Sequence, residues 1–319
     1  MTLLDLGIDI GGTKIAMGLS KKQGVGLTRK LVFSSQGKLP PTQWYARLKE
    51  NMWLVLGHDL KTFQDKGRIG VAIPGQILKD GRIGHCPNTP VLKKLNLAQW
   101  LKKDFKVPVH TDNDANAAAL AEHQFGAGRG IQRMVYLTIS TGIGGGIIEG
   151  GKLVTGNDHV AGEVGHLIIH FDGERCACGR RGCLEAYGRG PALEERIRRR
   201  LSQKKLSVGE KQLLNLAGGK ASHWRNTLIS RALKKHNPVI LQELDRHSFY
   251  LAVGIGSLAN ILNPERIVLG GGLTQLGKPL FAAIHKHLKS VAIPKHVDLR
   301  PAALGADVGI YGAIALCRK

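Results

Sequence analysis

The chain has 319 residues, of which 43% are hydrophobic and 42 are glycine, and its 46 Lys and Arg against 24 Asp and Glu give a formal net charge of +22. This composition is that of a loop-rich α/β protein and excludes a disordered chain, while the lack of an apolar run near ~18 residues and of a basic leader predicts a cytoplasmic protein with no membrane contact. The positive charge would ordinarily point to nucleic acid, but it is scattered and has few aromatic residues between the charges, so we expect no specific nucleic-acid binding.

The first half of the chain predicts two similar strand–turn–strand units. Residues 3–20 are apolar up to Asp9, turn at a double glycine and resume an extended pattern, and residues 134–153 repeat this layout. Between them we expect a helix over 42–56, a strand over 68–75, and a short strand running into a helix over 107–128. The glycine turn at Asp9 does not lead into a helix, which argues against a dinucleotide-binding fold. The two similar units indicate two related halves.

The second half is predicted to be mostly helical over residues 190–260. A buried strand over 263–273 then breaks into three glycines, and the tail 305–319 has the small residues of a helix that packs back on the N-terminal domain. A chain of this length is sufficient for two domains that share a cleft.

The run Pro191–Leu206 contains the densest positive charge. Proline stands in the first turn, Glu194 and Glu195 each precede an arginine by four residues, and apolar residues recur at four-residue spacing at Leu193, Ile197 and Leu201. This pattern predicts an amphipathic helix with a basic solvent face. The alternative is a surface on which an anionic polymer docks.

Three glycine clusters, each after an apolar strand, suit phosphate. The segment DIGGTK combines an acid, two glycines, a hydroxyl and an amine, so that backbone N–H groups can approach an anion while Asp9 holds Mg²⁺ directly or through water. The segment STGIGGG repeats this logic, and LGGGL lets an adenine or ribose lie against backbone. A plain hairpin turn is the alternative for any single cluster. The residues concerned are Gly11, Gly12, Thr13, Lys14, Thr141, Gly142, Gly144, Gly145, Gly271 and Gly272.

The segment TDNDANAAAL places polar groups at a predicted helix start. Asp114 can accept a hydroxyl proton there while Asn113 holds a neighbouring hydroxyl, as a phosphoryl acceptor requires. The alternative is that one of Asp112, Asn113 and Asp114 is simply the helix N-cap, since all three are good caps.

Three of the five cysteines lie within eight residues. Cys176, Cys178 and Cys183, with glycines at 179 and 182 for tight turns, form with His166 a Cys₃His set that is typical of a closed, structural zinc site. The alternative is reduced thiols in a loop. Glu163 and Glu185 flank the cluster, so a metal would hold both carboxylates rigidly, and His166 could offer its second ring nitrogen to a sugar hydroxyl.

Five motifs, spread in order over residues 5 to 315, resemble those of the ROK family of bacterial sugar kinases and repressors. They are DIGGTK, the ND of TDNDANAAALAE, ISTGIGGG, AGEVGH and CACGRRGCLE. The resemblance implies an actin-like, hexokinase-type ATPase fold of two α/β domains with an interdomain cleft, and a homodimer or homotetramer. We expect a smaller domain from residues 1–113 plus 304–319 and a larger one from 114–303 that carries the zinc loop. Because the first glycine motif begins at Asp9, we expect a kinase without the DNA-binding domain of the family's repressors.

The resemblance also assigns roles by motif position. Asp114 is the catalytic base, and Gly75, Asn113, Glu163, His166 and Glu185 bind the sugar. Asp9 and the ten glycine-cluster residues above bind Mg²⁺–ATP, and His166, Cys176, Cys178 and Cys183 bind structural Zn²⁺.

The glutamates of AGEVGH and CLEAY favour glucose as the hexose, phosphorylated at its 6-hydroxyl. The alternatives are an N-acetylglucosamine or N-acetylmannosamine kinase and a mannose or fructose kinase. The basic charge raises polyphosphate as a donor, but polyphosphate-using relatives generally lack the cysteine cluster, so ATP is favoured. A non-catalytic sugar sensor is the rival from another class.

Overall fold

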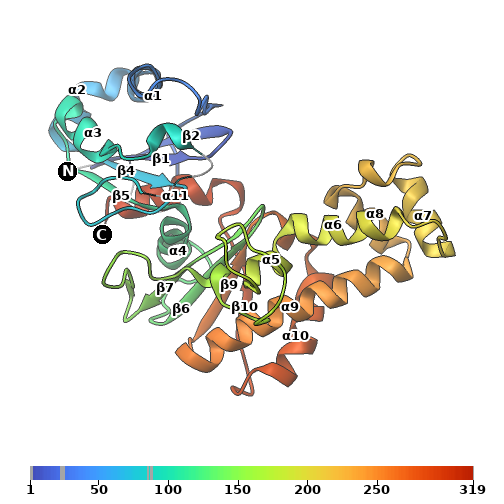
Figure 1. Cartoon of the computed structure of the whole chain (residues 1–319). Helices are drawn as coiled ribbons and strands as arrows, with labels where there is room; N and C mark the ends of the chain where they lie inside the picture. The colour runs from blue at the N-terminus through green and yellow to red at the C-terminus, as the bar shows by residue number, and fades with distance from the viewer. Residues whose placement is uncertain (1–2, 22–25, 85, 87–88, 319) are drawn as a thin grey trace. The chain divides into compact units, whose positions relative to one another are not determined.

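The computed structural model describes residues 3–21, 26–84, 86 and 89–318. They fall into two compact units (Figure 1). The first unit comprises Met1–Tyr136, Gly146–Gly162 and Ala302–Lys319, and the second comprises Leu137–Gly145 and Glu163–Pro301. The domain limits expected above stay a prediction.

The first sheet has the strand order β3-β2-β1-β4-β5. Strands β1, β2 and β3 are antiparallel neighbours, whereas β4 and β5 continue the sheet in parallel beyond β1. The central strands β1 and β4 are almost entirely buried, as strands covered on both faces must be. The bounds are β1 Leu4–Ile10, β2 Lys14–Ser20, β3 Arg29–Ser34, β4 Gly67–Ile73 and β5 Val109–Asn113.

Helices cover both faces of this sheet. Figure 1 shows α1, α2 and α3 on one face and α4 and α11 on the other. The large core lies under the first group, and a smaller cluster that includes Ala121, Ile310 and Ile314 lies under the second. The bounds are α1 Pro41–Leu56, α2 Leu60–Lys66, α3 Leu97–Phe105, α4 Asp114–Phe125 and α11 Val308–Leu316.

The second sheet repeats the topology of the first. Its order, β8-β7-β6-β9-β10 when counted from the hairpin edge, matches β3-β2-β1-β4-β5 strand for strand. The outer pair β7/β8 is antiparallel and β9/β10 is parallel, as in the first sheet. The prediction of two related halves is therefore confirmed. The bounds are β6 Met134–Ile139, β7 Ile143–Glu149, β8 Lys152–Leu153, β9 Arg266–Gly270 and β10 Leu299–Pro301.

The second unit adds most of the helices predicted for residues 190–260. They are α5 Leu184–Gly188, α6 Gly190–Leu201, α7 Val208–Leu216, α8 Ile229–Lys234 and α9 Pro238–Leu262, followed by α10 Lys278–Val291. Short 3₁₀ helices occupy Gly57–Asp59, Pro90–Leu92, Val164–His166, Ala221–His223, Asn226–Leu228, Gly272–Leu276 and Gly305–Asp307. No helix in the described part of the chain is long and apolar enough to cross a membrane.

The basic run forms the predicted helix α6, with its proline in the first turn and its apolar residues buried. Glu194 pairs with Arg198 four residues on, as the spacing indicates. Glu195 instead pairs with Arg189, which precedes the helix. The pairing with Arg199 that its spacing suggests is not made between these described residues.

Helix α11 packs against the first sheet at a distance that only glycine permits. A Cβ atom at Gly70 of β4 would lie 1.7 Å from the carbonyl oxygen of Ala313, and one at Gly7 of β1 would lie 2.6 Å from that of Ile310. Both obstacles are backbone atoms, which cannot rotate away. The small-residue tail therefore packs on the N-terminal sheet, as its sequence predicts.

Replacing Gly70 by Ala should lower the free energy of unfolding by about 1–3 kcal/mol, because the added methyl group forces the helix away from the strand. Urea denaturation would measure the change. Gly26→Ala is the matched control, since a Cβ atom there meets nothing within 4 Å. Equal midpoints for the two variants would contradict this account of the packing.

Candidate functional site

The predicted catalytic residues meet at the junction of β5 and α4 in the first unit. Asn113 is the N-cap of α4: its side-chain oxygen accepts hydrogen bonds from the amides of Ala115 at 2.9 Å and Asn116 at 3.3 Å. Its amide group donates to the carbonyl oxygen of Gly75 at 3.3 Å. Of the three capping candidates, Asn113 is therefore the cap, and this role holds it beside Gly75.

Asp114 is the first residue of α4, and its side chain is exposed. One carboxylate oxygen accepts the amide of Ala115 at 2.8 Å, which orients the group at the positive end of the helix. Asp112 has a different environment, because its carboxylate accepts the backbone amide of Asn113 and the side-chain amide of Asn116. Asp114 thus presents an exposed carboxylate, whereas the carboxylate of Asp112 supports the junction of β5 and α4.

The DIGGTK segment forms the turn between β1 and β2. The amide of Gly11 donates to the carbonyl oxygen of Lys14 at 2.8 Å, which closes the turn and leaves Gly12 and Thr13 exposed at its tip. Asp9, two residues before the turn, lies against α11, where a Cβ atom on Gly309 would come within 2.2 Å of its carboxylate. The turn therefore combines exposed backbone, the hydroxyl of Thr13 and the positive charge of Lys14 with the recessed carboxylate of Asp9.

Burial raises the pKa of Asp9 to about 6, although the neighbouring Lys14 acts in the opposite direction. Desolvation favours the neutral carboxyl, and a bound cation would favour the ionised one. A recessed carboxylate of this kind fits a role beside Mg²⁺ better than a role in an ion pair.

In the second unit, the predicted phosphate residues lie where β6 and β9 end. Thr141 is exposed in the turn between β6 and β7. Gly271 follows β9 with φ +89°, and a Cβ atom there would lie 2.4 Å from the carbonyl oxygen of Ile139. A side chain at Gly142 would meet the carboxylate of Glu185 at 2.6 Å. Glycine is thus required at Gly271, where the obstacle is backbone, whereas a side chain at Gly142 would displace the carboxylate of Glu185.

Gly144 and Gly145, in contrast, lie within β7 and outside the turn, although the sequence pattern suggests a continuous glycine nest. The neighbouring Gly146, in the first unit, shows one reason for glycine in this strand. A Cβ atom there would lie 2.6 Å from that of Ala119 in α4. Glycine in β7 therefore also serves helix packing, and the role of Gly144 and Gly145 toward ATP stays a prediction.

The four predicted zinc ligands converge. The ligand atoms of His166, Cys176, Cys178 and Cys183 all lie within 4.8 Å of one another. The sulfurs of Cys178 and Cys183 are 3.7 Å apart, and that of Cys176 is 3.8 Å from Nδ1 of His166. Two ligands ~2.3 Å from a common centre at the tetrahedral angle are separated by ~3.8 Å, so the group fits a zinc ion.

The loop that carries these cysteines depends on two glycines, as expected. Gly179 and Gly182 have φ values of +89° and +75°, and a Cβ atom at Gly182 would lie 1.7 Å from the carbonyl oxygen of His170. Burial raises the pKa of the Cys176 and Cys183 thiols. A dication would have to supply the free energy that converts these buried thiols to thiolates.

Both predicted sugar carboxylates of the second unit contact the metal cluster. Nδ1 of His166 faces Cys176, while its Nε2 lies 3.8 Å from the carboxylate of Glu163. The carboxylate of Glu185 accepts the amide of Ile143 at 2.8 Å with one oxygen and lies 3.7 Å from the sulfur of Cys176 with the other. The cluster therefore joins Glu163 and Glu185 to the loop that contains Thr141.

Glu122 on α4 was not singled out by the sequence. Its side chain is 0% exposed, and its carboxylate accepts the backbone amides of Ala127, Ala303 and Leu304 at 2.8–3.0 Å. All of these residues belong to the first unit. A glutamate within an alanine-rich helix indicates a buried carboxylate that binds other parts of the chain. The sequence does not show which parts, because Ala303 and Leu304 lie far from Glu122 in the chain.

Comparison with known proteins gives consistent matches. The glucokinase of Halalkalibacterium halodurans is 33% identical over 315 residues, which cover 96% of this chain and 92% of that protein. A ROK family glucokinase from Streptomyces griseus, solved with glucose and AMPPNP, superposes with a TM-score of 0.82 at 29% identity and 99% coverage of both chains. The ROK hexokinase of Thermus thermophilus gives a TM-score of 0.79 at 30% identity, covering 99% of this chain and 98% of that one.

These structures confirm the predicted fold class, an actin-like, hexokinase-type ATPase fold built from two mixed α/β sheets with helices. The family model described as ROK family matches residues 5–319, almost the whole chain. The chain therefore belongs to the ROK family.

Proposed function

We propose that the protein is an ATP-dependent glucokinase that transfers the γ-phosphoryl group of ATP to the 6-hydroxyl of glucose. The observation that carries this proposal is the junction of β5 and α4, where Asn113 is locked as a cap beside Gly75 and the next residue, Asp114, presents an exposed carboxylate. The Streptomyces griseus relative was solved with glucose and AMPPNP, and the Halalkalibacterium relative is named a glucokinase, which supports both substrates.

In the proposed reaction, Asp114 accepts the proton of the 6-hydroxyl as its oxygen attacks the γ-phosphorus. Asn113, Gly75, Glu163, His166 and Glu185 hold the other hydroxyls of the sugar. Their hydrogen bonds fix the direction of attack, which lowers the entropic part of the barrier.

The two hairpin turns and the loop after β9 hold the nucleotide. The exposed backbone at Gly12 and Thr13 and the hydroxyl of Thr141 donate to phosphate oxygens, and Lys14 adds a positive charge. Gly271 and Gly272 leave backbone free for the nucleoside. Mg²⁺ shields the phosphate charge when it is bound with ATP, and the recessed carboxylate of Asp9 is suited to hold it.

We further propose that His166, Cys176, Cys178 and Cys183 hold a structural zinc ion, because their four ligand atoms match the donor set and spacing of a closed site. The ion would hold Glu163 and Glu185 in place. A homodimer or homotetramer and a cytoplasmic location are proposed with the same function. None of the described contacts favours an N-acetylhexosamine, mannose or fructose kinase, polyphosphate as donor, or a sensor without activity.

Replacing Asp114 by Asn should lower kcat by about 10²- to 10⁴-fold and leave the KM for glucose within a few-fold, because the amide cannot accept the proton. A coupled assay of ADP release with Mg–ATP and glucose measures both constants. Asp65→Asn, an exposed aspartate on α2 of the same unit, is the matched control and should keep full activity. Near-normal turnover of Asp114→Asn would overturn the assignment of the base.

The same assay with N-acetylglucosamine, N-acetylmannosamine, mannose and fructose tests the sugar. Faster turnover of any of these than of glucose would replace the substrate and keep the mechanism. No turnover of any sugar with ATP would favour polyphosphate as donor or the sensor.

The zinc proposal predicts one zinc ion per chain and a higher KM for glucose after its removal by a chelator, because the loop that holds Glu163 and Glu185 loosens. Metal analysis and kinetics of the metal-free protein measure both. Cys178→Ser should lose the metal, whereas Cys317→Ser should retain it, since this buried thiol lies in α11's C-terminal cap. Unchanged kinetics without zinc would contradict the role in sugar binding.

The pKa of Asp9 predicts a dependence of stability on pH in the absence of Mg²⁺ and nucleotide. Between about pH 4 and pH 6 the folded protein binds this proton and the unfolded chain does not, so the contribution of Asp9 is present below pH 4 and lost as pH rises through 6. The loss is on the order of 3 kcal/mol. Denaturation of the wild type and of Asp9→Asn across this range should show that the variant lacks this fall. Parallel curves for the two proteins would contradict it.

A further inference from the structure

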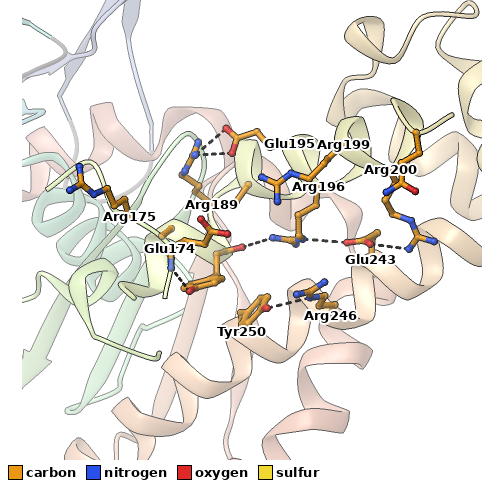
Figure 2. Close-up of a pocket in the computed structure, with 14 residues that line it drawn as sticks. Glu174, Arg175, Arg189, Glu195, Arg196, Arg199, Arg200, Glu243, Arg246 and Tyr250 are labelled. Carbon is orange, nitrogen blue, oxygen red and sulfur yellow. Dashed lines mark hydrogen bonds and ion pairs between the residues drawn. The ribbon is translucent and has the colours of Figure 1, made fainter. Parts of the chain in front are cut away.

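The second unit contains a cavity of about 240 Å³ whose lining is unusually rich in arginine. It lies between α5 and α6 on one side and α9 on the other, and the cysteine loop contributes Glu174 and Arg175 (Figure 2). None of the proposed sugar, nucleotide or zinc residues lines it. Its charged lining consists of Arg175, Arg189, Arg196, Arg199, Arg200, Arg246, Glu174, Glu195 and Glu243.

Buried ion pairs hold one wall of the cavity in place. The carboxylate of Glu243 is shared between Arg196 at 3.3 Å and Arg200 at 3.0 Å, and its side chain is only 6% exposed. Arg196 also donates to Nδ1 of the fully buried His247 at 2.9 Å and to the carbonyl oxygen of Tyr187 at 3.2 Å. These contacts make a rigid base that presents fixed guanidinium groups.

The remaining arginines exceed the carboxylates available to them. Glu195 binds Arg189 through both of its oxygens, at 3.0 and 3.1 Å. Arg246 donates only to the hydroxyl of Tyr250 within the cavity, at 3.2 Å. Among the described residues, the side chains of Arg175 and Arg199 make no hydrogen bond or ion pair.

The lining of this cavity carries excess positive charge. Six arginines and three glutamates surround about 240 Å³, and Glu210 pairs with Arg200 from outside the lining, which leaves an excess of two positive charges. Elsewhere in the same unit some arginines pair with a carboxylate, as Arg198 does with Glu194 and Arg266 with Asp298, whereas Arg225 donates only to carbonyl oxygens. A concave surface lined by charges of one sign concentrates anions, so the cavity is suited to a ligand that supplies the missing negative charge.

We propose that this cavity binds a small phosphorylated anion, at a site separate from the proposed active site. Guanidinium groups match phosphate oxygens in pairs, and several converge here on one volume. The cavity is smaller than the ~300–1,000 Å³ of typical drug-sized ligand pockets, which favours inorganic phosphate, a short polyphosphate or a sugar phosphate.

The cavity also adjoins the elements that carry the proposed sugar residues. Arg175 directly precedes the zinc ligand Cys176, and Arg189 follows α5, whose first turn contains Glu185. An anion that bridges these two arginines would restrain both elements and change the KM for sugar. This consequence rests on the proposed function, whereas binding of the anion does not.

Calorimetric titration of the zinc-loaded, full-length protein tests the site. Glucose is kept saturating and nucleotide is left out, and the probes are inorganic phosphate, tripolyphosphate and glucose 6-phosphate. We expect saturable binding of at least one probe that weakens as salt is raised. The ranking of the three probes distinguishes an inorganic from an organic source of the phosphate.

Arg199→Gln should weaken this binding about tenfold or more, since a hydrogen bond between charged groups is lost. Arg175→Gln should act in the same direction, with zinc content measured to show that the loop is intact. Arg231→Gln is the matched control, because this exposed arginine of α8 lies in the same unit and does not line the cavity.

No binding of any probe would overturn the proposal, as would binding that neither Arg199→Gln nor Arg175→Gln weakens. Binding that ADP displaces and that both variants retain would place the anion in the glycine loops instead. A protein without kinase activity that still binds the probe through Arg199 would refute the proposed function and leave this site standing.

Discussion

A single buried carboxylate organises the first unit. The carboxylate of Glu122 accepts hydrogen bonds from the backbone amides of two separate segments. One is the loop after α4, and the other is residues 303–304, where the chain approaches its last helix. A buried carboxyl group without such partners would cost several kcal/mol, so these segments must stay together. The start of α4, with Asn113 and Asp114, is thereby fixed to the packing of α11 on the sheet, which Gly7 and Gly70 allow. The geometry of the proposed base depends on this arrangement.

In the second unit, the cysteine loop connects several of the proposed site residues. His166 faces a thiol with one ring nitrogen and the carboxylate of Glu163 with the other, and Glu185 connects the same cluster to the turn that contains Thr141. Groups proposed to bind the metal, the sugar and the phosphates are therefore neighbours in one network.

The sequence predicts local features well, because their causes are local. The double glycine after Asp9 defines a hairpin turn, and the hydrophobic spacing after Pro191 defines α6. The sequence does not show which of several competing partners a residue contacts in the folded protein. Asp112, Asn113 and Asp114 are equal as caps by residue type, and only the fold selects Asn113; Glu195 has an arginine four residues ahead, yet it pairs with Arg189. The partners of Glu122 and the arginine cavity were missed for the same reason, since residues distant in the chain create them.

The matching strand order of the two sheets, β3-β2-β1-β4-β5 and β8-β7-β6-β9-β10, bears on the history of the chain. It is the pattern that duplication of an ancestral half leaves behind. The turn at Gly12 and the turn at Thr141 are then copies of one ancestral loop. The segment between β8 and β9, which contains the cysteine loop and helices α5 to α9, has no counterpart of that length between β3 and β4, where α1, the 3₁₀ helix Gly57–Asp59 and α2 intervene. The two halves thus differ mainly by the long segment between β8 and β9.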